Sequence, residues 1–239
     1  MSRDDPALAR LERGDLEIVE RMPWSSNATF LAVVTAGDVD EGDVVVIYKP
    51  ERGERPLWDF PHGTLASREV AAYEVSEASG WGIVPPTILR DGPYGVGMVQ
   101  LFVDHDPEEH FLELRDLHGD RFREFAAFDV VINNADRKSG HCVRGRDAHV
   151  WGIDHGVSFH VGHKLRTVIW DYAGEPLPER VIDGLCRVAR GLDSDLAAHL
   201  HDLLDGDEIA ATRRRVQALL DEGVFPLPRG DYPYPWPLV

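Results

Sequence analysis

The sequence predicts an α+β fold with a small β-rich N-terminal part and a mainly helical C-terminal part. Two observations predict it. Up to about residue 102, most apolar segments are short, and several alternate with polar residues as strands do. From residue 103 onward, apolar residues recur mainly at helical spacing. The chain has 239 residues and 43% hydrophobic content, which is enough for a sizeable core in one large domain or two lobes.

The N-terminal part, residues 1–102, is predicted to begin with a short helix over residues 3–13 and three strands. The alternation in "LEIVERM" and the apolar run "ATFLAVVT" indicate the first two strands. The third, "VVVIYKP" over residues 44–50, is predicted to be buried on both faces because successive positions are apolar. A helix over residues 65–80 follows, with Gly80 at its C-cap, and then a hairpin whose turn region is "DGPYG".

The C-terminal part, residues 103–239, is predicted to begin with "HFLELRDLHGDRFREFAAFDVVINN", which has helical spacing in two pieces. One or two short strands are expected within residues 149–159, and two or three helices within residues 176–221. The segment "FPLPRGDYPYPWPLV" that ends the sequence has five prolines and cannot form a regular helix. We expect this tail to lie extended on the surface.

Charge and cysteine content exclude several classes of function. The formal net charge is −17, with 42 acidic and 25 basic residues, whereas a nucleic-acid-binding surface is normally basic. Anionic membranes should also repel the chain, and its apolar runs are too short to span a bilayer. The two cysteines have no paired spacing, and the N-terminus has no apolar signal region. We therefore expect a cytoplasmic protein without nucleic-acid partners or stable membrane association.

A β-rich part followed by a helical part is the outline of a kinase. Phosphoryl transfer needs a cation on the phosphates, backbone donors over them, acidic metal ligands and a carboxylate that positions the nucleophile. The cation that binds phosphates is expected to be Lys49, at the end of the strand over residues 44–50. Its acidic partner is expected to be Glu69, the first acid of the following helix, with Glu74 and Glu77 as competitors. Taken singly, each charge has an ordinary alternative: a lysine at a strand end, or a solvated helix acid.

The phosphate-binding loop is expected between the first two strands, in "MPWSSNATF". Neither of the usual glycine-rich fingerprints occurs there. Ser25, Ser26 and Asn27 can offer hydroxyls and backbone N–H groups to phosphate oxygens. An ordinary turn with an asparagine at its tight position explains the same residues equally well.

The polar stretch "NNADRKSGH" supplies the remaining chemistry. Asp136 follows an apolar run, His141 comes five residues later, and Asp154 comes after "CVRGRDAHVWGI". In kinases the first aspartate positions the attacking hydroxyl and the other two positions bind metal. Lys138 can neutralise the transferring phosphoryl group. Taken singly, each aspartate has an ordinary alternative: Asp136 as the cap of a turn, and Asp154 as the ion-pair partner of Arg137.

"NNADRKSGH" followed by "WGIDHGVSF" resembles the catalytic loop and metal-binding segment of the phosphatidylinositol 3-/4-kinase-like superfamily. HipA-type bacterial kinases share the general layout. The resemblance covers residues 16–220 and is strongest at Lys49, Glu69, Asp136 and Asp154. It implies a two-lobed protein-kinase-like fold of the atypical kinase type. It also implies that Lys49 is the phosphate-binding lysine and Glu69 its partner, that Asp136 is the catalytic aspartate, and that Asp154 is a metal ligand. It also implies that "GMVQLFV" is the hinge strand, whose backbone faces the adenine at Gln100, Leu101 and Phe102.

The chain departs from the superfamily at His141, where an asparagine is usual. Imidazole is a softer ligand than an amide oxygen and suits Mn²⁺ better than Mg²⁺. It also titrates near neutrality when unperturbed. The departure therefore bears on metal preference and on full activity.

The function predicted from the sequence is an ATP-dependent phosphotransferase that uses Mg²⁺ or Mn²⁺ and moves the γ-phosphate to a hydroxyl group. The acceptor is not readable: a protein serine or threonine, a small alcohol and an inositol lipid stay open. Two alternatives remain, a pseudokinase that binds nucleotide or a partner without catalysis, and a kinase fold that transfers AMP. His141 and the absence of a glycine-rich loop favour the pseudokinase.

Overall fold

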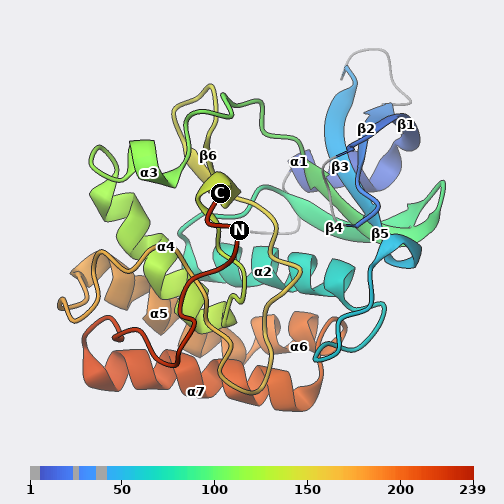
Figure 1. Ribbon diagram of the computed structural model, residues 1–239. Helices are drawn as coiled ribbons and strands as arrows, with labels where there is room; N and C mark the ends of the chain where they lie inside the picture. Colours follow the sequence, from blue (N-terminus) through green and yellow to red (C-terminus); the bar gives the residue numbers. More distant parts are fainter. Residues whose placement is uncertain (1–5, 24–26, 36–41) are drawn as a thin grey trace.

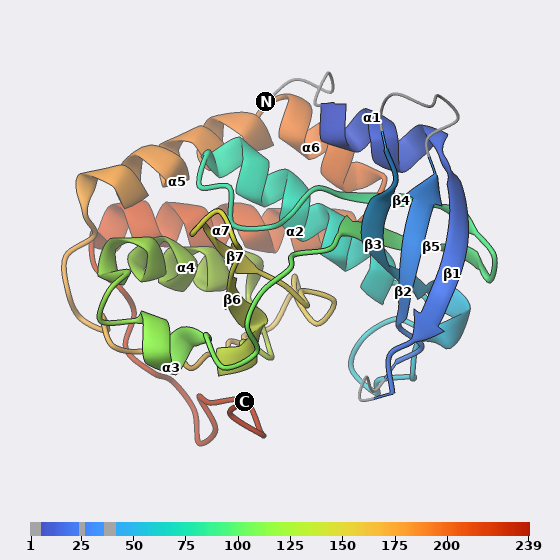
Figure 2. The same ribbon diagram turned by 90° about the horizontal axis from the view of Figure 1, so that it is seen from above.

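The computed structural model describes residues 6–23, 27–35 and 42–239. An antiparallel sheet from the N-terminal part stands beside a larger helical part, as the sequence predicts (Figures 1 and 2). The sheet ends at Leu101, and the boundary between two domains at residues 102 and 103 stays a prediction. Within the described ranges, no helix is both long enough and apolar enough to cross a membrane.

The sheet has five antiparallel strands in the order β1-β2-β3-β5-β4. Their bounds are β1 (Asp15–Arg21), β2 (Phe30–Thr35), β3 (Val44–Pro50), β4 (Thr87–Gly92) and β5 (Gly95–Leu101). The predicted hairpin is the β4–β5 pair, whose turn uses a positive φ of 98° at Gly95. The short helix α1 (Pro6–Arg13) covers one face of the sheet, where Leu11 packs with Phe30, Val34 and Tyr48.

The prediction that β3 is buried on both faces is wrong. Val46 and Tyr48 are fully buried in the core of the sheet. On the other face Val45 is exposed, and Ile47 and Lys49 are half-buried. Ile47 and Lys49 line a cavity between the sheet and the helical part, so an apolar run that resembles a central core strand instead has one face on a binding cavity.

Helix α2 (Leu65–Ser79) lies between the sheet and the helices of the C-terminal part (Figure 2). It is buried on most sides because β4 and β5 cover it on one side and α5 and α6 on another. Gly80 ends the helix in the left-handed region at φ 70°, as predicted, and its N–H bonds to the carbonyl oxygen of Glu77. Arg68 joins α2 to α7 through a buried ion pair of 2.6 Å with Glu208.

The helical part contains α3 (Phe111–Leu114), α4 (Gly119–Ile132), α5 (Glu179–Leu192), α6 (Asp195–His201) and α7 (Gly206–Glu222). Its core is formed largely by aromatic residues of α4 and apolar residues of α2, α5 and α7. A small hairpin of β6 (Cys142–Arg144) and β7 (Val150–Gly152) stands at its edge. Single 3₁₀ turns occupy Glu51–Gly53 and Ser139–His141.

The tail, residues 224–239, has neither helix nor strand, as predicted. It starts where Val224 pairs with Pro176, and Phe225 packs into the main core. From the end of α7 it runs back across the helical part, and the C-terminus lies at the surface, on the face that points toward the viewer in Figure 1 and at the edge of the molecule in Figure 2.

Candidate active site

The loop of residues 133–141 leaves helix α4 in a direction that two asparagines set. Asn133 ends the helix in the left-handed region at φ 51°, a conformation that asparagine tolerates. The Asn134 side chain donates to the carboxylate of Asp129 at 3.0 Å and accepts a hydrogen bond from the N–H of Asp136 at 3.0 Å. Asp136 is therefore presented from a fixed turn.

A buried ion pair forms the inner support of this loop. Arg137 and Asp129 are both fully buried, and their side chains pair at 3.0 Å. Arg137 also donates to the carbonyl oxygens of His141 at 3.2 Å and Ile153 at 3.3 Å, and to the ring of His155 at 2.7 Å. It thus joins the loop to the segment that follows β7.

Arg137 has Asp129, not Asp154, as its carboxylate partner, so the alternative sequence interpretation of Asp154 is wrong. Sequence reasoning missed Asp129. Its signal was an acid inside the apolar run "AAFDVVI", because a buried carboxylate requires a charged or hydrogen-bonding partner.

Lys49, Glu69 and Asp154 converge from three separate elements. The ammonium nitrogen of Lys49 lies 2.7 Å from Oε1 of Glu69 and 2.8 Å from Oδ1 of Asp154. The second oxygen of Glu69 accepts a 2.7 Å hydrogen bond from the N–H of His155. Strand β3, helix α2 and the segment after β7 are therefore joined at one point.

The electrostatics where Lys49, Glu69 and Asp154 meet favour the charged forms of Lys49 and Asp154. Burial opposes the charge of Lys49, but the carboxylates of Asp154 and Glu69 raise its pKa above the ordinary value. The Lys49 ammonium holds the pKa of Asp154 far below its ordinary range. Burial raises the pKa of Glu69, and Lys49 opposes that shift. Asp154 has φ 60°, in the left-handed region that is uncommon for residues other than glycine.

The other predicted residues of the loop lie close to this point. Nζ of Lys138 is 3.2 Å from Oδ2 of Asp136, and Nε2 of His141 is 3.5 Å from Oδ2 of Asp154. Burial raises the pKa of Asp136, whereas Lys138 lowers it and Asp154 raises it further. Burial lowers the pKa of His141 to about 4, so its imidazole is neutral at physiological pH and does not titrate near neutrality.

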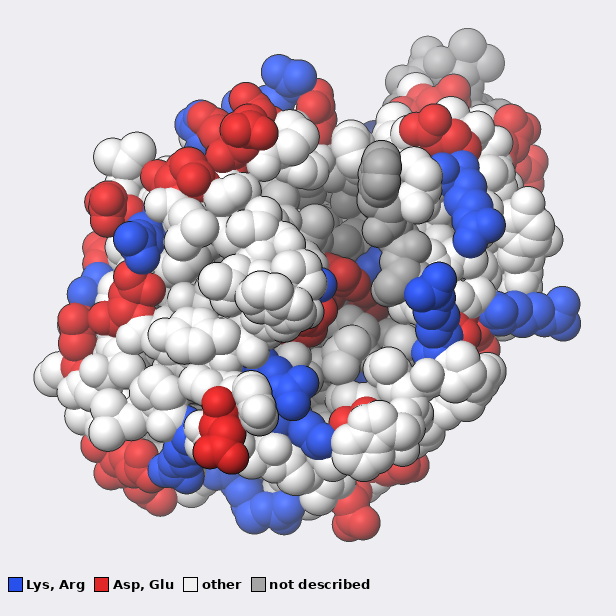
Figure 3. Space-filling view, viewed as in Figure 1, with Lys and Arg blue, Asp and Glu red and all other residues white. Residues whose placement is uncertain are grey.

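A cavity of about 450 Å³ opens between the sheet and the helical part. In the space-filling view this face is hollowed between the two lobes, with acidic side chains inside the hollow (Figure 3). The side chains of Asp154 and Asp136 are 52% and 33% exposed. The predicted residues that line the cavity are Lys49, Gln100, Leu101, Phe102, His141 and Asp154. The lining residues that sequence reasoning missed are Met22, Thr29, Ile47, Val103, His105, Gly140, Val143 and Ile153.

The backbone of the predicted hinge is partly used by the protein itself. The N–H of Leu101 donates to Pro86 at 2.9 Å, and the N–H of Phe102 donates to Val45 at 3.0 Å. The Gln100 side chain donates to the Thr87 hydroxyl. No described residue accepts a hydrogen bond from the N–H of Val103, the next residue of the cavity wall.

The phosphate-binding loop predicted from the sequence is only partly described. Ser25 and Ser26 lie outside the described residues. Asn27 accepts a hydrogen bond from the N–H of Arg55 at 2.9 Å, so its side-chain oxygen serves the loop after β3.

The potential metal ligands are few. Among the described residues, no three His, Cys, Asp or Glu side chains converge in a way that would hold an ion. Asp154 and His141 face each other, which provides one carboxylate and one neutral imidazole. Mg²⁺ sites in nucleotide enzymes commonly have one or two protein ligands, and phosphates and water supply the rest.

A comparison with known protein sequences finds a relative that matches nearly the whole chain. Protein Rv2133c of Mycobacterium tuberculosis strain ATCC 25618 / H37Rv is 42% identical, over 99% of this chain and 97% of that protein. No family model matches the chain.

Two solved structures share its architecture. The Helicobacter pylori proinflammatory kinase CtkA has a TM-score of 0.55 at 10% identity, over 89% of this chain and 94% of CtkA. Hydra Fam20 with sugar has a TM-score of 0.52 at 13% identity, over 91% and 88%. The fold is therefore that of atypical kinases, while the specific resemblance to phosphatidylinositol 3-/4-kinases stays a prediction.

Proposed function

We propose that this chain, which belongs to the same protein family as Protein Rv2133c of Mycobacterium tuberculosis, is an ATP-dependent kinase. The observation that carries the proposal is the position of Lys49, within 2.8 Å of both Glu69 and Asp154 at the wall of a cavity in a kinase-like fold. A lysine held by a helix acid next to a metal-binding aspartate is the arrangement that phosphoryl transfer needs.

ATP would lie in the 450 Å³ cavity. Gln100, Leu101 and Phe102 form part of its wall, and the N–H of Val103 is the backbone donor left for the adenine. Lys49 would bind the α- and β-phosphates while Glu69 holds its ammonium in place. Ser25, Ser26 and Asn27 stay the proposed phosphate-binding loop.

The donor pair Asp154 and His141 fits a divalent cation. Two ligands about 2.1 Å from one ion and roughly at right angles to each other are about 3 Å apart. Nε2 of His141 and Oδ2 of Asp154 are 3.5 Å apart, so a small adjustment brings them to that separation. Nδ1 of His141 accepts a 3.5 Å hydrogen bond from the N–H of Lys138, so Nε2 carries the proton of the neutral ring and would have to lose it to bind the ion. A bound Mg²⁺ or Mn²⁺ would neutralise charge on the β- and γ-phosphates.

Asp136 and Lys138 are the proposed catalytic residues. Asp136 accepts the proton of the acceptor hydroxyl as that oxygen bonds to the γ-phosphorus. The bond from the γ-phosphorus to the β–γ bridging oxygen breaks, and ADP leaves. Lys138, 3.2 Å from Asp136, lies where it can offset negative charge on the transferring group.

The acceptor is a hydroxyl compound, with protein serine or threonine, a small alcohol and an inositol lipid as the proposed classes. The net charge of −17 disfavours nucleic acid and stable binding to an anionic membrane. A cytoplasmic location is proposed because the two cysteines have no paired spacing, which fits a reducing compartment.

The test uses γ-labelled and α-labelled ATP in a host lysate. We expect transfer of the γ-label only, and a 10²- to 10⁴-fold slower transfer by Asp136→Asn, roughly the range for loss of a positioned acid or base. The matched control is Asp120→Asn, because that side chain is fully exposed on α4. Transfer of the α-label would instead indicate AMP transfer. ATP binding without any transfer would indicate a pseudokinase.

A further inference from the structure

The tail is bound to the 133–141 loop of the candidate active site and to the 164–170 segment beside that loop. The carbonyl oxygen of Leu238 accepts a 2.8 Å hydrogen bond from the N–H of Ser139, inside the 133–141 loop. The carbonyl oxygen of Pro233 accepts bonds of 3.1 Å from the N–H of Thr167 and from the indole N–H of Trp170. Ser139 lies between Lys138 and His141 in the sequence.

The two backbone donors need these acceptors. Ser139 is fully buried, and Thr167 is 2% exposed. A buried N–H without an acceptor is strongly unfavourable, so the loop keeps this conformation at low cost only while the tail, or water that enters in its place, accepts these hydrogen bonds. The tail therefore supplies hydrogen bonds that the loop cannot obtain from its own part of the chain.

The 133–141 loop and the 164–170 segment are also bonded to each other. The N–H of Arg166 donates to Asn134 at 2.9 Å, and the N–H of Arg137 donates to Arg166 at 3.0 Å. The N–H of Val168 donates to Arg137 at 3.1 Å. Since the tail bonds to both members of this pair, it fixes them together from outside.

We infer that the tail is a positioning element for catalysis, which holds Lys138 and His141 in place through Ser139. The inference rests on the proposed kinase function. It is based on the hydrogen bonds that the carbonyl groups of Leu238 and Pro233 accept.

The alternative role, that the tail blocks the site, does not fit its path. None of the described residues that line the nucleotide cavity comes from the tail. Asp136 and Asp154 keep exposed side chains with the tail in place. The largest tail side chain, Trp236, is 88% exposed and so does not fill the cavity.

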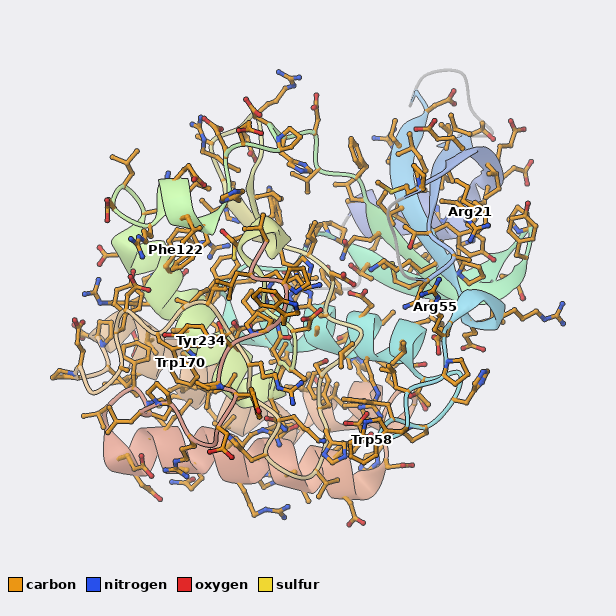
Figure 4. All side chains as sticks on the ribbon, in the orientation of Figure 1. Arg21, Arg55, Trp58, Phe122, Trp170 and Tyr234 are labelled. Carbon is orange, nitrogen blue, oxygen red and sulfur yellow. The ribbon has the colours of Figure 1, made fainter. Side chains whose placement is uncertain are left out.

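The side chains at the end of the tail are mostly exposed, with Pro235 as a buried exception. Tyr234 and Leu238 line a cavity of about 370 Å³ together with Trp170 and Leu112, and the Tyr234 and Trp170 side chains lie together in Figure 4. Because this contact is not close-packed and the core cluster contains no residue beyond Phe225, removing the last residues should leave the fold intact.

Two shortened chains test the inference. One ends after Pro237 and loses the acceptor for Ser139. The other ends after Tyr232 and loses the acceptor for Thr167 as well. The matched control is the full chain with Trp236→Ala, which removes an exposed aromatic side chain and keeps every backbone acceptor.

Three quantities are measured in each chain: kcat per ATP-binding site, KM for ATP, and hydrogen exchange of the Ser139 and Thr167 amides. We expect kcat to fall about tenfold in the first chain and about 10- to 100-fold in the second, because small misplacements of catalytic groups have effects of this size. KM for ATP should stay within about twofold in both. Exchange should become faster at Ser139 in both chains and at Thr167 in the second, and Trp236→Ala should match the parent.

A kcat that is unchanged or higher in the chain ending after Pro237 would overturn the inference, as would unchanged exchange at Ser139. If the longer deletion fails to fold, the shorter one decides. If the full chain transfers no phosphate, the proposed function fails, and the exchange rates alone then show whether the tail holds the loop.

Discussion

At Lys49, one ammonium is shared between a buried carboxylate and a part-exposed one. Glu69 is 2% exposed and also binds the backbone of His155, whereas Asp154 is 52% exposed. Under the proposed function, a cation that arrives with the phosphates would compete with Lys49 for Asp154 but not for Glu69. Lys49 would then keep Glu69 as its partner and could turn to the phosphates.

The Asp129–Arg137 pair gives a prediction on stability. Asp129→Asn leaves the guanidinium of Arg137 buried without a counter-charge, and breaking a buried pair in this way costs about 3–5 kcal/mol. The free energy of unfolding in urea should fall by that amount. The control is Asp193→Asn, which breaks an exposed pair with Arg213 and should change stability by about 0–1 kcal/mol. Equal effects of the two variants would contradict the supporting role of Asp129.

Individual residues differ in how well the sequence predicts them. Lys49, Glu69 and Asp154 were predictable as a group because kinase chemistry requires them in a fixed order. Arg137 was misread because a charge in a polar loop has no signature of burial. Its partner Asp129 lies 8 residues earlier in the chain, inside α4, and only folding brings the two side chains together.

At the scale of elements, close packing of α5 on Trp81 gives a second prediction. A Cβ at Gly184 would lie 2.2 Å from Nε1 of Trp81, and both residues are buried. Gly184→Ala gains up to about 1 kcal/mol in helix propensity, but overpacking costs about 1–3 kcal/mol, so a net loss is expected. Chemical unfolding measures it. Gly206→Ala at the start of α7 meets nothing within 4 Å and should be neutral or stabilising. A parent-like Gly184→Ala would mean that Trp81 has room to move.

His149, in the turn between β6 and β7, gives a prediction on how the stability of the fold depends on pH. Nε2 of His149 lies 2.8 Å from the carbonyl oxygen of Gly82, and partial burial together with Arg121 lowers the pKa of His149. Glu124 and Asp147 face it more weakly and raise its pKa. Since the unfolded chain binds the proton more readily, the contribution of His149 to stability is present above about pH 6.5 and is lost below it.

His149→Gln should therefore lose less unfolding free energy than the parent when the pH falls from 7.5 to 5. The comparison is made by urea unfolding at both values. A variant with the same pH dependence as the parent would show that other groups cause the acid sensitivity.

Regular elements were predictable where they are long. The helices α2, α4, α5 and α7 lie where the apolar spacing indicated, because each buries apolar residues over several turns, α5 and α7 along one side and α2 and α4 on most sides. Strand β6 has three residues, too few for a period to be visible, and it was missed. The prediction that β3 is buried on both faces was wrong because an apolar cavity wall and an apolar core give the same residue pattern.

For the whole molecule, motif order carried information that periodicity lacks. Lys49 and Asp154 are 105 residues apart and still meet, as kinase chemistry requires. The path of the tail was not predictable beyond its lack of regular structure, since its hydrogen bonds to Ser139, Thr167 and Trp170 are accepted by backbone carbonyls that any sequence possesses. The N–H of Val103, which has no acceptor among the described residues, was likewise not predictable, because Val103 lies beyond the end of β5 and its surroundings depend on tertiary structure.

Nucleotide binding gives the prediction that concerns the molecule as a whole. ATP would contact the sheet and the helical part at once, so binding should stabilise both against unfolding. At a free ATP concentration 100 times Kd, the gain is about 2.7 kcal/mol. For a chain of this length, each kcal/mol raises Tm by roughly 2–4 °C, so a shift of roughly 5–10 °C is expected.

Thermal unfolding with ATP, alone and with Mg²⁺ or Mn²⁺, measures this shift. The larger shift should require a divalent cation, because the ion would join Asp154 to the phosphates. With His141 as the second ligand, Mn²⁺ should give a shift at least as large as that of Mg²⁺. Lys49→Met should lose most of the shift, while Lys164→Met should keep it, because Lys164 pairs with Asp59 outside the cavity. A shift that is equal with and without metal, or that survives Lys49→Met, would mean that nucleotide binds somewhere other than this cavity.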